Sequence, residues 1–482
     1  MTYGEARMLI NGTWTQSAAT RGFAVINPAT GAVIEEVADG GRAEADAAID
    51  AAHEALPAWR ATTAYERSAI LYKAYHLMLE RREELARLMT TEQGKPLRAA
   101  RTEVQYGADF LLWFAEEAKR IYGETIPAPR GDQRFIALRQ PVGVVAAITP
   151  WNYPISMITR KVGPALAAGC TVVLKPAEAT PLCAIAIFKI LEEAGVPAGV
   201  ANLVTGADPR PIGEAFTTNP KVRKLTFTGS TAVGKMLAGK AAANMKRVSC
   251  ELGGHAPFLV FADADPVHAA KGAQLVKFLN TGQACISPNR MYVHRSIHDA
   301  FVETLAGRAS KMVAGDGLTE GVTIGPLVNE AAVSKVANQV DDARAKGAEV
   351  VCGGGRLTDN GLDKGFFYAP TVLSGITPEM TIYREETFGP VAAIIPFDDD
   401  QEALAMANDT HYGLAAYVYT RDISRAMRMF EGLDFGIVGI NDINPSAAAA
   451  PFGGIKDSGL GREGAREGIA EYLETKLGGF SI

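Results

Sequence analysis

The chain has 482 residues, of which 48% are hydrophobic and 21% charged, and its formal net charge is −6. The length predicts roughly two to four domains, and the apolar content excludes a disordered chain. The acidic balance argues against a general nucleic-acid or anionic-membrane binder, because such proteins need a basic surface.

Targeting and redox signals point to the cytoplasm. The first residues carry no long apolar run, and no stretch approaches about 18 uninterrupted apolar residues, so neither a signal peptide nor a membrane span is expected. The five cysteines contain no C-x-x-C pair, which argues against a secreted disulfide framework. The histidines form no H-E-x-x-H motif, and no metal site is expected.

The first forty residues read as short strands and turns. Helical periodicity follows, with apolar residues at three- and four-residue spacing. The expected helices are residues 43–59, 63–91 and 103–120. Gly94 and Pro96 end the second of them.

Short apolar runs of strand length then alternate with helical stretches. The expected strands are residues 142–148, 171–175, 201–206 and 224–229, and the expected helices between them are 155–168, 181–194 and 230–244. Strands that are buried on both faces give continuous apolar runs, so this alternation predicts a parallel, doubly wound α/β sheet.

A second α/β region follows the Gly- and Pro-containing segment ELGGHAP at residues 251–257. Its expected strands are 258–261, 291–294, 391–395, 415–419 and 436–440, and its expected helices include 264–280 and 399–408. The predicted fold class is therefore α/β, with two doubly wound domains and a hinge between them.

Cys285, in NTGQACISPNR, follows an expected helix through a glycine-containing turn. A cysteine is most often a small buried hydrophobe. Small polar flanks and a loop position favour a nucleophile instead, because function concentrates on loops and a thiolate is strongly nucleophilic.

Glu251 and Asn152 are candidate partners of this cysteine. Glu251 lies between an apolar strand end and a double glycine, where it is either a partly buried general base or a solvated loop carboxylate. Asn152, in TPWNYP, follows a parallel strand, so its amide is a candidate oxyanion donor or the cap of the next helix.

Two segments favour a bound dinucleotide. TFTGSTAVGK, residues 226–235, places a glycine turn and a helix N-terminus after a strand, which suits an anion, although the pattern alone is weak. Lys175 and Glu178, in KPAE, suit ribose hydroxyls, and a carboxylate there repels a 2′-phosphate. The pair predicts NAD rather than NADP, with ordinary turn charge as the alternative.

These motifs, with EETFGP and PFGGIKDSGLGREG, resemble the aldehyde dehydrogenase superfamily from about Asn11 to Ser481. The resemblance implies an NAD-dependent oxidoreductase that converts an aldehyde to an acid through a cysteine thiohemiacetal and a thioester hydrolysed by water. It also implies a homo-oligomer, either dimer or tetramer. The implied segments are a Rossmann-like cofactor domain at residues 1–121 and 139–251, a catalytic domain at 252–440, an oligomerisation segment at 122–138 and 465–482, and a return to the cofactor domain with a substrate loop at 441–464.

Residue by residue, the resemblance implies Cys285 as nucleophile, Glu251 as base and Asn152 as oxyanion donor. The implied cofactor-binding residues are Thr149, Pro150, Trp151, Lys175, Glu178, Gly206, Phe227, Gly229, Ser230, Val233, Leu252, Glu386 and Phe388.

Within the superfamily, residues 158–181 are most similar to the succinate-semialdehyde dehydrogenase group. In that group an arginine at the position of Arg160 binds the distal carboxylate of the substrate, which suits its bidentate fork. The alternative for Arg160 is a surface salt bridge. The expected substrate-binding residues are Tyr153, Met157, Arg160, Leu279, Ile286, Ser446 and Phe452.

Leu279 departs from the group, which usually carries a second arginine six residues before the nucleophile. The departure favours a longer or less polar substrate such as glutarate semialdehyde, and GQACISP is similar to 2-oxoglutarate-semialdehyde dehydrogenases. Ser287 stands where many members have a second cysteine, which excludes a disulfide at that pair. The rival expectations are a CoA-acylating enzyme, which generally lacks Glu251, and a catalytically silent binding protein on the same fold.

Overall fold

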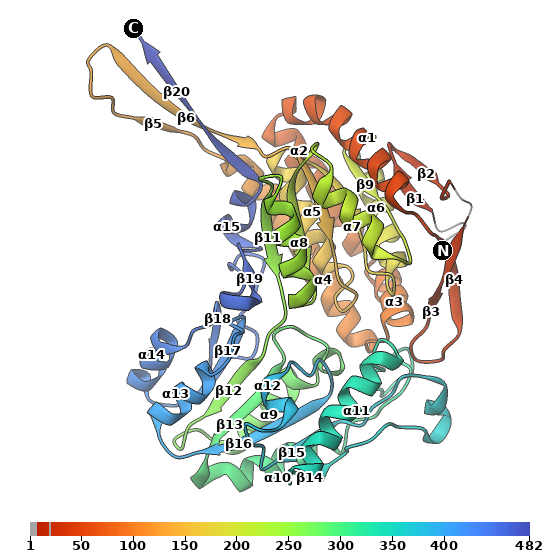
Figure 1. The fold of residues 1–482 in the computed structure, drawn as a ribbon, viewed down its shortest axis with the longest axis vertical. Helices are drawn as coiled ribbons and strands as arrows, with labels where there is room; N and C mark the ends of the chain where they lie inside the picture. The colour runs from red at the N-terminus through yellow and green to blue at the C-terminus, as the bar shows by residue number, and fades with distance from the viewer. Residues whose placement is uncertain (1–6, 19–20) are drawn as a thin grey trace.

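The computed structural model describes residues 7–18 and 21–482, and Figure 1 shows two α/β bodies with a thin sheet projecting from one of them. Residues 1–6, which open the predicted cofactor segment, lie outside the described residues. No helix within the described ranges is both long and apolar enough to cross a membrane.

The first body is built on an eight-stranded sheet. Its spatial order is β19 (Gly459–Leu460), β11 (Arg247–Glu251), β10 (Val222–Thr228), β7 (Val144–Ile148), β8 (Thr171–Lys175), β9 (Ala201–Leu203), β1 (Met8–Ile10) and β2 (Thr13–Thr15). The five strands from β11 to β9 are parallel, and the edge strands are antiparallel. Because both faces are covered, β7 and β8 are almost entirely buried, which explains their continuous apolar sequences.

Strand β7 is the first of the five parallel strands in the chain, and the order of strand addition reverses there. The chain adds β8 and β9 on one side of β7 and then β10 and β11 on the other. A crevice therefore opens between the carboxyl ends of β7 and β10, where doubly wound sheets bind ligands. The helices of this body are α1 (Arg42–Ala61), α2 (Ala64–Glu80), α3 (Arg82–Gln93), α4 (Leu97–Glu117), α5 (Ser156–Ala168), α6 (Pro181–Ala194), α7 (Pro209–Thr218) and α8 (Thr231–Ala242).

The second body has a seven-stranded sheet that is parallel except for one edge. Its order is β14 (Glu349–Cys352), β15 (Thr371–Ser374), β16 (Val391–Phe397), β13 (Pro288–His294), β12 (Ala256–Val260), β17 (Ala415–Tyr419) and β18 (Ile437–Ile440). Its helices are α9 (Pro266–Lys277), α10 (His298–Ala309), α11 (Glu330–Ala345), α12 (Thr381–Arg384), α13 (Asp400–Asn408) and α14 (Ile423–Gly432). The predicted α/β class with parallel sheets is thus confirmed.

A three-stranded antiparallel sheet projects from the first body (Figure 1). It consists of β20 (Leu473–Ser481), β6 (Gln133–Pro141) and β5 (Glu124–Ile126), and α15 (Ala465–Ala470) leads into β20. Strand β6 extends three residues beyond the predicted excursion at 122–138. A separate hairpin, β3 (Gly22–Ile26) with β4 (Val33–Ala38), lies near the N-terminus.

Three predicted helices have other bounds in the structure. The segment 63–91 is broken at Arg81 into α2 and α3, although the apolar spacing continues across the break. Helix α4 begins at Leu97, six residues before the predicted start, because Pro96 is its N-cap. Helix α9 ends at Lys277, because Asn280 and Thr281 adopt positive φ values that no α-helix contains.

Candidate active site

Cys285 lies on the loop between α9 and β13 and is 9% exposed at the inner end of a cavity of about 580 Å³. This volume suits a small organic ligand. The structure brings the seven predicted substrate residues to the lining of the same cavity: Tyr153, Met157, Arg160, Leu279, Ile286, Ser446 and Phe452.

The loop before Cys285 has a strained backbone. Asn280, Thr281 and Gly282 have φ values of 49°, 60° and 75°, all in the left-handed region. Two of these are not glycine, and such conformations persist only where surrounding contacts hold them. Gln283 supplies such contacts, because its side chain donates to the Asn280 carbonyl and accepts from the Val328 N–H at 2.9 Å.

Glu251 is the last residue of β11 and is 2% exposed, so it is not the solvated carboxylate that the sequence left open. Neither carboxyl oxygen has a hydrogen-bond partner among the described residues. Burial raises the pKa of Glu251 to about 6, and the positive charge of Arg160 opposes this shift. A buried carboxyl with a pKa near neutrality is suited to accept and release protons.

The Cys285 thiol and the Glu251 carboxyl are both buried, and their charges are coupled. Burial raises the pKa of the Cys285 thiol well above its ordinary value, and the neighbouring Glu251 charge raises it further. The thiol is therefore protonated in this environment, and Glu251 is positioned to take its proton.

The double glycine after Glu251 is required by close approaches. A Cβ on Gly254 would lie 2.3 Å from the Cys285 carbonyl oxygen, and one on Gly253 would lie 2.9 Å from Glu386 Oε2. The motif ELGG thus lets the base-bearing segment pass directly against the nucleophile loop.

Asn152 lies in the turn after β7, and its side chain faces the nucleophile loop. Its Nδ2 donates to the Gln283 carbonyl at 3.0 Å, which uses one of two N–H groups. It is not the cap of α5, because Ile155 holds that position. The Asn152 carbonyl accepts hydrogen bonds from Lys95 Nζ and Asn280 Nδ2, each at 2.8 Å.

A buried ion pair between Lys95 and Glu103 fixes the segment that carries Asn152. The Lys95 ammonium also lies 4.1 Å from the centre of the Tyr153 ring. Glu103 accepts hydrogen bonds from the backbone N–H groups of Ile155 at 3.0 Å and Ser156 at 3.2 Å. Burial lowers the pKa of Lys95, against the opposing charge of Glu103.

Sequence reasoning missed this pair, although one signal of it was available. Glu103 falls on the apolar face of its helix with Ala100, Val104 and Gly107, where a carboxylate needs a buried partner.

Arg160 lies on α5 and is only 2% exposed, which contradicts a surface salt bridge. Its guanidinium carbon lies 4.1 Å from the centre of the Phe452 ring, and its Nη2 lies 2.8 Å from Glu463 Oε2. Burial lowers the pKa of Arg160, but the Glu463 charge outweighs this and leaves the pKa raised. Arg160 Nη2 is engaged by Glu463, whereas Nε has no hydrogen-bond partner among the described residues.

Glu463 is a second site residue that the sequence did not single out. It also pairs with Lys161, the neighbour of Arg160 on α5. Burial alone would raise the pKa of Glu463, but Lys161 and Arg160 outweigh it and lower the pKa. Glu463 is therefore ionised and holds both cations beneath the cavity.

The predicted cofactor residues of the first body follow the carboxyl ends of its parallel strands or lie at those ends. Val233 lies at the start of α8 and is 41% exposed, which suits an apolar contact with a ligand. These ends border the crevice between β7 and β10. The residues are Thr149, Pro150 and Trp151 after β7, Lys175 and Glu178 at β8, Gly206 after β9, Phe227, Gly229, Ser230 and Val233 at β10 and α8, and Leu252 after β11.

Lys175 and Glu178 form an ion pair with a separation of 2.7 Å. Lys175 is buried whereas the Glu178 side chain is 38% exposed. Burial lowers the pKa of Lys175, against the charge of Glu178. The exposed carboxylate presents acceptors that fit the hydroxyls of a ribose.

Glu386 and Phe388 come from the second body and meet the first at this edge. Glu386 accepts a hydrogen bond from the Gly254 N–H at 3.0 Å, and burial raises its pKa to about 7. Phe388 has a φ of 55°, and its ring lies edge-on to Trp151 at 5.6 Å between centroids. The residues present thus fit a dinucleotide that runs from Glu178 toward Glu386.

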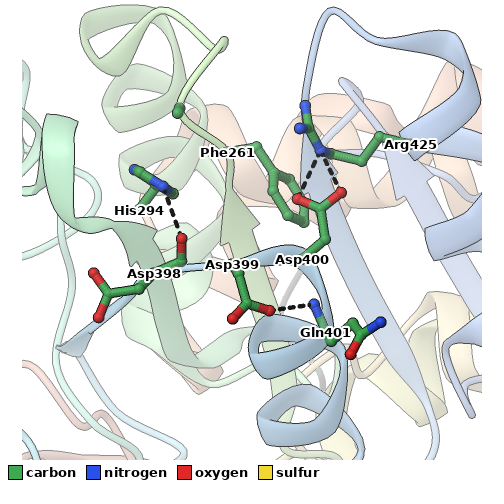
Figure 2. A pocket seen from close by; sticks show the side chains of 8 residues that line it. Phe261, His294, Asp398, Asp399, Asp400, Gln401 and Arg425 are labelled. Atoms are coloured by element: carbon green, nitrogen blue, oxygen red, sulfur yellow. Dashed lines mark hydrogen bonds and ion pairs between the residues drawn. The ribbon is translucent and has the colours of Figure 1, made fainter.

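A hollow on the far side of the second body does not provide a comparable site. Figure 2 shows the carboxylates of Asp399 and Asp400 in structural contacts, and the Asp398 carboxylate pairs with Arg295. Asp400 pairs with Arg425 at 2.9 Å, and Asp399 caps α13. These bonds explain the acidic cluster without a ligand.

Comparison with known proteins gives one consistent family. The Aldehyde dehydrogenase family pattern matches residues 14–477. The chain is 53% identical over 468 residues to a succinate-semialdehyde dehydrogenase of Escherichia coli that is named for NADP(+), with 97% of this chain and 96% of that protein covered. It is 52% identical to a glutarate-semialdehyde dehydrogenase of Pseudomonas putida, with 97% and 96% covered. A betaine aldehyde dehydrogenase of Staphylococcus aureus in complex with NAD+ has a TM-score of 0.97 at 37% identity, with 99% and 95% covered.

Proposed function

Because the chain belongs to the aldehyde dehydrogenase family, we propose that it oxidises an acid-bearing aldehyde to the dicarboxylate at Cys285, with NAD as hydride acceptor. The observation that carries the proposal is the packing of the segment after Glu251 against the Cys285 loop, which leaves the buried thiol and the buried carboxyl electrostatically coupled. A nucleophile beside a base, at the inner end of a cavity, is the arrangement that acyl chemistry requires.

The reaction follows from these groups. Glu251 takes the thiol proton as Cys285 Sγ adds to the aldehyde carbon. The Asn152 amide and the Cys285 backbone N–H hold the oxyanion that forms, and one such donor is typically worth about 10²–10³ in rate. Bound NAD⁺ supplies the hydride acceptor. Glu251 releases that proton to solvent and then removes a proton from water. The hydroxide attacks the thioester carbon, the C–S bond breaks, and the acid leaves while the Cys285 thiolate takes the proton from Glu251.

The fate of the thioester distinguishes the rival enzymes. A CoA-acylating enzyme needs no base to activate water, whereas Glu251 is present here and buried beside the thiol. Hydrolysis is therefore favoured over transfer to CoA. Cys285 lines the cavity, and the segments that carry Glu251 and Asn152 pack against its loop. This arrangement equally disfavours a catalytically silent binding protein.

Arg160 supports a substrate with a distal acid group. Its guanidinium lines the cavity, its Nε has no hydrogen-bond partner among the described residues, and an Arg fork suits a carboxylate. The curated relatives are named for succinate and glutarate semialdehyde. Succinate semialdehyde is the first candidate, and glutarate or 2-oxoglutarate semialdehyde is the alternative that Leu279 favours.

The cofactor preference rests on Glu178. Its exposed carboxylate, at the end of β8, would repel a 2′-phosphate and accept bonds from a free ribose hydroxyl. We therefore assign NAD as the preferred cofactor, with NADP less favoured, and assign the eight-stranded sheet to cofactor binding. The second body supplies the nucleophile.

The projecting sheet supports an oligomer, either a dimer or a tetramer. Its side chains Leu138, Leu477 and Phe480 are 49%, 63% and 51% exposed. Apolar groups gathered on a thin exposed sheet are typical of a surface that another subunit covers. A cytoplasmic enzyme is proposed with it, since the five cysteines are free thiols.

The decisive experiment measures kcat/KM with NAD⁺ for succinate semialdehyde, glutarate semialdehyde and uncharged aldehydes of matched length. Cys285→Ala should abolish oxidation while NAD⁺ still binds, as measured by isothermal titration calorimetry. Persistent oxidation by that variant would reject Cys285 as the nucleophile. Equal rates for acidic and neutral aldehydes would reject an acid-specific site.

A further inference from the structure

The cavity in front of Cys285 has an inner and an outer end. Cys285 and Arg160 mark the inner end, with 9% and 2% of their surfaces exposed. Leu275 and Arg98 also line the cavity, and both are exposed, Leu275 by 49%. Arg308, also in the lining, is half-buried. The opening of the cavity therefore carries two arginines.

These two arginines are cations without an acidic partner. Among the described lining residues, Glu103 is the only carboxylate, and it is paired with Lys95. Arg160 is paired with Glu463. Arg98 and Arg308 form no ion pair with any described residue, so the opening holds a local positive excess on a chain of net charge −6. Such a field concentrates anions at the opening.

The two side chains come from different bodies of the molecule. Arg98 lies in the first turn of α4, which contains no acidic residue. A cation at a helix N-terminus is unfavourable to the helix dipole, so Arg98 does not stabilise α4. Arg308 lies on α10, and its Nε donates to Gln274 Oε1 at 2.9 Å. That bond fixes the guanidinium and leaves its other N–H donors for a ligand.

We propose that Arg98 and Arg308 form an outer anion subsite, which extends the substrate range to aldehydes whose acid group is carried on a chain longer than that of a four-carbon semialdehyde. This inference rests on the proposed oxidation at Cys285. With the aldehyde carbon at the inner end, a four-carbon acid stays beside Arg160, whereas a longer chain crosses Leu279 and Leu275 to the opening. Those apolar side chains suit methylene groups, and the arginines suit the terminal acid.

The test compares wild type, Arg98→Ala, Arg308→Ala and the double variant. The substrates are linear ω-oxo acids of four, five and six carbons and the neutral aldehydes of equal length, with NAD⁺ saturating. Each single variant should lower kcat/KM for the six-carbon acid by about fivefold, as expected for the loss of one partly exposed ion pair. The double variant should lose more, and the neutral aldehydes should be unaffected.

Arg101→Ala is the matched control. Arg101 lies on the same helix, is paired with Glu83 at 2.7 Å and does not line the cavity. It should leave every substrate unchanged. Leu279→Arg should move the preference toward the four-carbon acid, because it places a guanidinium nearer the inner end.

Ionic strength gives a readout that a merely structural role would not move. Added salt should raise KM for the six-carbon acid in wild type and have little effect in the double variant, because salt screens exposed charges. Equal losses on acidic and neutral substrates, or no loss on the acids, would overturn the outer subsite. Oxidation of the acidic aldehydes at the same kcat/KM in wild type and the double variant would reject this subsite alone, whereas no oxidation of any aldehyde would reject the proposed function itself.

Discussion

Glu251→Gln tests the active site through two independent measurements. The variant keeps the shape of the side chain but cannot accept a proton. Loss of a general base typically costs about 10²–10⁴ in rate, so kcat should fall by that factor while NAD⁺ binding is retained. In wild type, activity should rise with pH through about 6, because the base acts only when it is deprotonated.

The same substitution should stabilise the protein above neutral pH. Burial raises the pKa of Glu251 from 4.5 to about 6, and this shift corresponds to about 2 kcal/mol. Between these values the folded state keeps a proton that the unfolded state has released, so wild-type stability falls as pH rises. Glutamine carries no charge at any pH, and the variant avoids this loss.

Urea unfolding of both proteins at about pH 5 and about pH 8 measures the effect. The difference in free energy of unfolding, variant minus wild type, should be roughly 1 kcal/mol larger at pH 8 than at pH 5. Glu320→Gln, at an exposed position, is the control and should show no such gain. The same pH dependence of unfolding free energy in wild type and Glu251→Gln would refute the raised pKa of Glu251. A kcat of the variant within tenfold of wild type would refute its role as the base.

Three further predictions concern other parts of the molecule. Lys95→Met should destabilise the protein by about 3–5 kcal/mol in urea unfolding, because it leaves the Glu103 charge buried without its partner. The double variant Lys95→Met with Glu103→Leu should recover most of this stability. An unchanged stability of Lys95→Met would show that the ion pair is not needed. Glu178→Gln should raise kcat/KM with NADP⁺ relative to NAD⁺, since the repulsive charge is gone; an unchanged ratio would remove Glu178 from cofactor selection. Leu477→Asp should dissociate the oligomer in size-exclusion chromatography if the projecting sheet lies at the interface, and an unchanged elution volume would place the interface elsewhere.

The elements that could be predicted from sequence are those with local periodicity. Strands β7 and β8 are buried on both faces, and their apolar runs have no other interpretation as short segments. The break at Arg81 could not be predicted, because neither glycine nor proline marks it and the apolar positions continue on both sides. Strand β11, which ends in Glu251, was expected only as an apolar strand end without bounds, because Arg247 and Ser249 interrupt its apolar character.

The candidate site divides in the same way. Cys285, Glu251 and Asn152 stand in short motifs whose chemistry is readable residue by residue. Lys95 meets Asn152 only after folding, across 57 positions of chain, and Glu463 meets Lys161 across 302. Pairings at such separations leave no periodic pattern in the sequence, so the sequence predicted the candidate reacting groups but not the ion pairs around them.

Strand β11 owes one edge to residues that are made much later in translation. Its partner β19 places Gly459 against Glu251 and Leu460 against Cys250, roughly 200 residues after the base itself. A ribosome that adds about 5–20 residues per second needs on the order of 10–40 s to bridge that gap. Throughout this interval β11 has an unpaired edge, and Arg160 and Lys161 lack their acidic partner Glu463. A nascent chain that already contains Cys285, Glu251 and Asn152 therefore still lacks part of the site. A premature stop before residue 459 would remove strand β19 and the Glu463 carboxylate.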